Sequence, residues 1–122
     1  MKKEFIPYEQ ALALKKLGFD EPCIGWYNPQ VNYKEVTTDK YWAFHLTGEW
    51  ENFKPAPLYQ QAFRWFRNEH GMSGSIQIEH DAYQWSIFEE GETSGLASDN
   101  WDGTDYEEAE LACLEKLIEM AH

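Results

Sequence analysis

Basic residues are nearly absent from the second half of this 122-residue sequence. From Leu58 onward, three basic residues stand against fourteen acids, a net charge of −11, whereas the chain up to Pro57 has seven lysines and eight acids, a net charge of −1. A field of this sign repels phosphate, so we expect no direct nucleic-acid binding through the C-terminal half. It favours basic or cationic partners, although an acidic surface can also serve only to keep a protein soluble.

Long apolar runs are missing as well, and no stretch approaches the roughly 20 residues of a membrane span. Residues 1–4 are followed by Phe5-Ile6-Pro7 rather than by the apolar core of a signal peptide. One disulfide is arithmetically possible, but Cys23 and Cys113 lie far apart in apolar surroundings, which is typical of buried free thiols in a reducing compartment. We therefore expect a cytoplasmic protein with no membrane association.

Familiar catalytic and cofactor-binding motifs are also absent. The sequence contains no G-x-x-x-x-G-K-[ST] loop, no G-x-G-x-x-G and no G-x-S-x-G. The histidines, His45, His70, His80 and His122, form no pair at i, i+3 or i+4, and the cysteines form no metal-binding pair. We expect no metal, no cofactor and no catalytic residue, and we favour a protein that is not an enzyme.

What the chain does have is aromatic side chains. Apolar residues make up 43% of the sequence and aromatic residues 16%, including six tryptophans. Because each large ring buries about 150–250 Å², we expect a core built on aromatic rings. The length is typical of one domain, so we predict a single α+β domain over residues 1–122.

Three segments have the pattern of helices. The first covers residues 7–17, beginning at Pro7 and ending before Gly18. The second runs from residue 57 or 58 to 70, with apolar residues at helical spacing. The third runs from residue 105 or 106 to about 120, with acidic residues in its first turn and a broad apolar face.

Four segments have the pattern of strands: residues 23–27, 41–46, 75–80 and 83–88. The short link between the last two predicts an antiparallel hairpin. Residues 30–39 are ambiguous, residues 49–57 are predicted as a loop, and residues 91–103 as a loop with one short strand around Leu96. The expected fold is α+β, with three helices packed on one face of a small antiparallel sheet of three to five strands.

Two surfaces are candidates for binding. The first is acidic and would bind a basic protein partner; its residues are Glu89, Glu90, Glu92, Glu107, Glu108, Glu115 and Glu119. The second is aromatic, because Trp50 and Trp101 lie in predicted loops, where exposed rings can stack on sugars or bases. That alternative describes a small-ligand (nucleotide or sugar) binding protein or a minor enzyme with a cleft lined by these rings. Loop tryptophans also close the rim of small cores, which leaves a purely structural role open.

Residues 57–67 (PLYQQAFRWFR), 8–22 (YEQALALKKLGFDEP) and 106–114 (YEEAELACL) together carry a resemblance. The sequence resembles small uncharacterised proteins carried by phages, prophages and mobile elements of Bacteroidetes. The resemblance covers most of the chain, with variable loops between the matching segments. That family has no assigned activity, so the resemblance carries over no functional residues. It implies a cytoplasmic accessory protein acting in the biology of a phage or mobile element.

Overall fold

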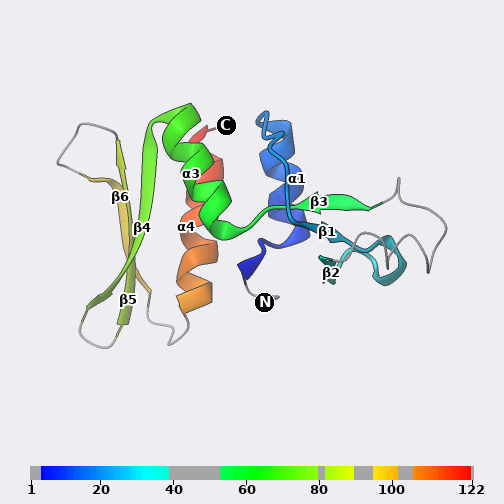
Figure 1. Ribbon diagram of the computed structural model, residues 1–122. Coiled ribbons are helices and arrows are strands. Elements are labelled where there is room, and N and C mark those ends of the chain that lie inside the picture. Colours follow the sequence, from blue (N-terminus) through cyan, green and yellow to red (C-terminus); the bar gives the residue numbers. More distant parts are fainter. Residues whose placement is uncertain (1–3, 39–52, 80–81, 90–94, 102–105, 122) are drawn as a thin grey trace. The chain divides into compact units, whose positions relative to one another are not determined.

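A computed structural model of the chain describes residues 4–38, 53–79, 82–89, 95–101 and 106–121 (Figure 1). The chain divides into two compact units, Met1–Leu58 and Tyr59–His122. The boundary coincides with the change in charge, so the first unit carries a net charge of −1 and the second a net charge of −11. The single domain expected over residues 1–122 stays a prediction.

The first unit combines one α-helix with a small antiparallel sheet. Its elements are α1 (Tyr8–Lys16), β1 (Gly25–Tyr27), the 3-10 helix η2 (Pro29–Val31), β2 (Val36–Thr37) and β3 (Lys54–Ala56). The strand order is β2-β1-β3, so β1 is central, and Trp26 pairs with Thr37 on one side and Pro55 on the other.

Helix α1 ends where the sequence predicts. Gly18 has a φ of +109°, a conformation that glycine adopts without the penalty of a Cβ atom. The N–H of Gly18 donates to the carbonyl of Lys15 (3.1 Å), and the N–H of Phe19 donates to the carbonyl of Leu14 (3.0 Å). These two bonds satisfy carbonyls that the helix leaves open, and they turn the buried Phe19 back towards α1.

The core of the first unit is aromatic, as expected. Phe5, Tyr27 and Ala56 are buried at its centre. The ring of Tyr8 stacks on Tyr33, with centroids 4.4 Å apart, and meets Tyr27 edge to face at 5.1 Å. The hydroxyl of Tyr27 donates to the carbonyl of Ile6. These contacts hold the face of α1 that carries Tyr8 against the core of the first unit.

One prediction for this unit is wrong. The sequence predicts a loop over residues 49–57, but Lys54–Ala56 forms β3. Lys-Pro-Ala has low intrinsic strand propensity, and the strand exists because it pairs with β1. It lies at the edge of the sheet, where proline is tolerated. The strand predicted over residues 41–46 lies outside the described residues.

The second unit packs two helices on one face of a three-stranded antiparallel sheet (Figure 1). Its elements are α3 (Tyr59–His70), β4 (Met72–Glu79), β5 (Ala82–Glu89), β6 (Gly95–Trp101) and α4 (Tyr106–Ala121), with strand order β4-β5-β6. The predicted hairpin is confirmed, because β4 and β5 pair along their whole length. Strand β6 is longer than the short strand expected around Leu96, since pairing with β5 overrides the weak strand propensity of its Ser, Asp and Asn residues.

Helix α4 approaches β4 closely at Gly74. A Cβ atom at this position would lie 2.9 Å from Sγ of Cys113 and 3.2 Å from Cδ1 of Leu117. Both of those side chains are fully buried. Only glycine therefore allows the helix to sit at this distance from the strand.

The α+β class is confirmed, and the described residues contain the three expected α-helices, α1, α3 and α4. The described strands form two three-stranded sheets, one in each unit, rather than one continuous sheet. The sequence pattern predicts a strand from that strand's own residues alone. Apart from the one hairpin, it does not indicate which strands pair, and so it does not predict that they form two sheets.

Candidate interaction surface and pocket

Helix α4 has an apolar face and an acidic face. Its buried residues are Ala109, Cys113, Leu114, Leu117 and Ile118. On the opposite side, Glu108, Glu115 and Glu119 are exposed, and their spacing of seven and four residues places them in one row along the helix. We call these three residues the acidic stripe.

The structure brings together only part of the predicted acidic surface. Glu107 is half-buried and lies beside the stripe rather than on it. Glu89 is exposed at the end of β5, where it pairs in register with Met72 of β4. Glu90 and Glu92 lie outside the described residues.

The stripe has one basic neighbour on its own helix, Lys116. The Nζ atom of Lys116 lies 3.3 Å from Oε1 of Glu119, and the Glu119 side chain is 72% exposed. An exposed pair of this kind contributes little stability, about 0–1 kcal/mol. Lys116 therefore offsets part of the negative charge of the stripe without covering it.

A further acidic residue, Glu110, lies on the buried side of α4 and was not among the predicted site residues. Burial, followed by the charge of Glu107, raises the pKa of Glu110 to about 7. The charges of Glu110, Glu115 and Glu107 also act on Tyr59 of α3, whose pKa is raised chiefly by burial. The helical spacing of Glu110 with Cys113 and Leu117 is the sequence signal that would have identified it.

Both cysteines are free, Cys113 buried and Cys23 half-buried. Burial, with the charge of Glu110, raises the pKa of Cys113 to about 12, although a backbone hydrogen bond from Ser75 opposes the shift. Burial and the charge of Glu21 raise the pKa of Cys23 to about 11. Both groups are therefore thiols at neutral pH, which is the unreactive form.

Neither a metal-binding cluster nor a membrane-spanning helix occurs among the described residues. No group of three or more His, Cys, Asp or Glu side chains in them is arranged to hold a metal ion. None of the helices described is both long enough and apolar enough to cross a bilayer.

The aromatic surface predicted from Trp50 and Trp101 stays a prediction. Trp50 lies outside the described residues. Trp101 was expected in a loop and instead ends strand β6, of which only the backbone is described at that position.

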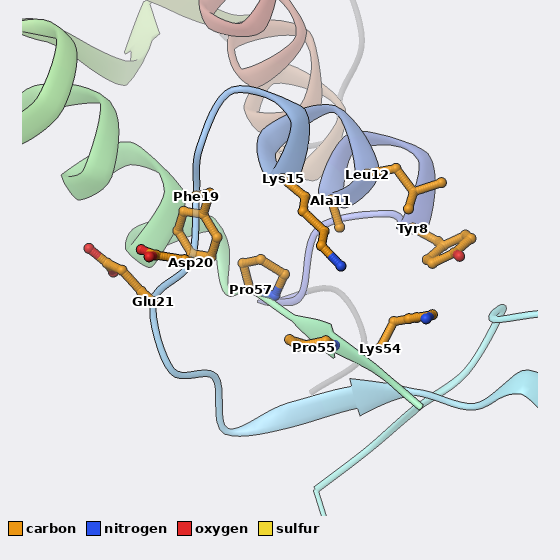
Figure 2. A pocket seen from close by; sticks show the side chains of 10 residues that line it. All are labelled: Tyr8, Ala11, Leu12, Lys15, Phe19, Asp20, Glu21, Lys54, Pro55 and Pro57. Carbon is orange, nitrogen blue, oxygen red and sulfur yellow. The ribbon is translucent and has the colours of Figure 1, made fainter. Parts of the chain in front are cut away.

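The first unit contains a pocket of about 260 Å³ that the sequence did not indicate (Figure 2). Its lining comes from α1, from the segment after α1 and from the region of β3; the residues are Tyr8, Ala11, Leu12, Lys15, Phe19, Asp20, Glu21, Lys54, Pro55 and Pro57. Figure 2 shows Asp20 and Glu21 on the side opposite Lys54 and Tyr8, with Phe19 and Pro57 between them. The pocket thus has a basic end, an apolar middle and an acidic end.

Compared with protein-family models, curated proteins and solved structures, the chain matches none of them. The acidic stripe and the pocket are therefore the features on which a functional proposal rests.

Proposed function

We propose that this protein is a non-enzymatic, cytoplasmic accessory protein of a phage or mobile element that binds a basic protein partner through its acidic C-terminal half. The acidic stripe of α4 is the centre of the proposed surface, and the proposal also includes Glu89, Glu90, Glu92 and Glu107. The observation that carries the proposal is the exposure of Glu108, Glu115 and Glu119 in one row on a unit with a net charge of −11.

The geometry of the stripe suits a basic segment of a protein. At a rise of 1.5 Å per residue, the eleven steps from Glu108 to Glu119 span about 16 Å along the helix axis. The buried face of α4 anchors this helix, so its carboxylates are held in a row rather than on a mobile tail. Lys or Arg side chains at similar spacing on a partner would meet them, and the surrounding negative field would speed their encounter.

Charge reversal of the stripe tests the proposal. We expect the triple variant Glu108→Lys, Glu115→Lys, Glu119→Lys to bind the partner about tenfold more weakly or worse, because attraction becomes repulsion at the contact. A tagged pull-down from host lysate, washed at rising salt and read by mass spectrometry, identifies the partner. Its affinity for the wild type and the variant is then measured by calorimetry with the purified proteins.

A matched control separates the stripe from net charge. Glu4, Glu9 and Glu35 are exposed glutamates of the first unit, and reversing all three changes the net charge by the same amount. This control is expected to retain most of the affinity. Equal losses in both triple variants, or unchanged binding by the stripe variant with its circular dichroism spectrum intact, would contradict the proposal.

A further inference from the structure

We infer that the pocket of the first unit is a binding site for a small organic anion that carries a single ring. This site is independent of the acidic stripe, since every lining residue belongs to the first unit. Three properties of the pocket carry the inference: its size, its cationic end and the acidic residues at its other end.

The size of the pocket limits its occupant. A cavity of about 150 Å³ holds benzene, and pockets for drug-sized ligands begin at about 300 Å³. A volume of about 260 Å³ therefore accommodates one ring and a charged head group. The buried Phe19 and Pro57 lie between the two charged ends, where they offer a flat apolar contact to that ring (Figure 2).

The cationic end is built from two different elements. Lys15 stands on the last turn of α1 and Lys54 on β3, and the fold brings both to one pocket. Neither ammonium group makes an ion pair or a hydrogen bond to any residue that the structure describes. Two cations at one pocket, each without a described partner, favour a carboxylate or phosphate between them.

Tyr8 adds a donor at the same end. Its ring is fixed by stacking on Tyr33 and by the edge contact with Tyr27. Burial, together with the charge of Tyr33, raises the pKa of Tyr8, so the hydroxyl keeps its proton and can donate to an anion at neutral pH.

The acidic end selects against ligands that carry negative charge at both ends. Asp20 and Glu21 would repel a second anionic group placed beyond the ring. The favoured ligand is therefore anionic at one end only, with an uncharged or cationic far end. Polyanions, such as nucleic acid or a nucleoside triphosphate, do not fit this arrangement of charges.

The test is titration of the full chain, labelled with ¹⁵N, with benzoate, phenyl phosphate, benzylamine and inorganic phosphate. We expect at least one of the two ring anions to shift the amide signals of pocket residues saturably and to bind more tightly than benzylamine. No saturable shift from either ring anion at about 10 mM would overturn the site, since this concentration detects even millimolar affinity. Binding of inorganic phosphate as tight as that of phenyl phosphate would overturn the role of the ring.

Neighbouring lysines of α1 provide the matched variants. Lys15→Gln is expected to weaken binding of the ring anion about fivefold, whereas Lys16→Gln, the next residue and outside the pocket, leaves it unchanged. Lys54→Gln is expected to act like Lys15→Gln. Lys15 and Lys16 are both exposed, so neither substitution threatens folding. Equal effects of Lys15→Gln and Lys16→Gln would show attraction by overall charge and would overturn the inference.

Discussion

Gly74→Ala is expected to lower the free energy of unfolding by about 2–3 kcal/mol, although it adds only one methyl group. The added Cβ would lie 2.9 Å from Sγ of Cys113 and 3.2 Å from Cδ1 of Leu117. The first distance is shorter than Cβ atoms in proteins keep from atoms to which they are not bonded. Both neighbours are fully buried, so helix α4 must shift or their side chains must leave their rotamers. Gly→Ala at an unstrained position instead stabilises a protein by about 0.4–1 kcal/mol, so the sign of the effect is itself diagnostic. Urea denaturation measures it.

Cys113→Ala makes this test specific, because it removes the sulfur that the new methyl group would strike. Alone, it should cost about 1–2 kcal/mol through loss of a buried side chain. Combined with Gly74→Ala, the total loss should be smaller than the sum of the single losses by about 1 kcal/mol or more. Strict additivity would contradict the close approach of α4 to β4.

Glu110→Gln is expected to change how stability depends on pH. The carboxyl has a folded pKa of about 7 and an ordinary value of 4.5, so the folded protein holds this proton more tightly than the unfolded chain does. The protonated carboxyl therefore adds to the free energy of unfolding. This stabilisation is fully present below pH 4.5 and is lost as pH rises through 7. A pKa shift of this size corresponds to about 3 kcal/mol of unfolding free energy. Because the group is only half-buried, water screens the effect, and we expect about 1–2 kcal/mol.

Urea unfolding between about pH 5 and 8 checks this expectation. Glutamine resembles the protonated carboxyl in shape and cannot ionise, so the variant should be about as stable as the wild type near pH 5 and more stable by about 1–2 kcal/mol near pH 8. Glu115→Gln, on the exposed side of the same helix, is the control and should run parallel to the wild type across this range. A parallel curve for Glu110→Gln would show that its carboxyl ionises normally.

The helices were predictable from sequence because their pattern is local. In α3 the buried residues Tyr59, Ala62, Trp65 and Phe66 recur at helical spacing, and Gly71 has a φ of +68°, which ends the helix. The observed bounds, Tyr59–His70, lie within two residues of those predicted. In α4 the same spacing distinguishes the buried face from the acidic stripe in the sequence alone.

Strands β3 and β6 were harder to predict, because their residues do not favour strands in isolation. Lys54–Ala56 becomes a strand only beside β1, and Gly95–Trp101 only beside β5. The pocket was unpredictable for the same reason, since Lys15 and Lys54 share it only once β3 has formed. Glu110 differs, because its place between Ala109 and Cys113 on an apolar face was already visible in the sequence.

The positions of the two thiols allow opening of the second unit to be measured by chemical modification. Each unit contains one cysteine, half-buried in the first and fully buried in the second. A thiol-specific reagent applied to the native protein should thus modify Cys23 early and Cys113 only when the second unit opens. Following the two modification rates in one sample by peptide mass spectrometry yields the opening equilibrium of the second unit from Cys113, while the accessible Cys23 serves as the internal reference for the reagent. Coincident rates for Cys113 and for global unfolding would reveal that the second unit opens only when the whole chain unfolds.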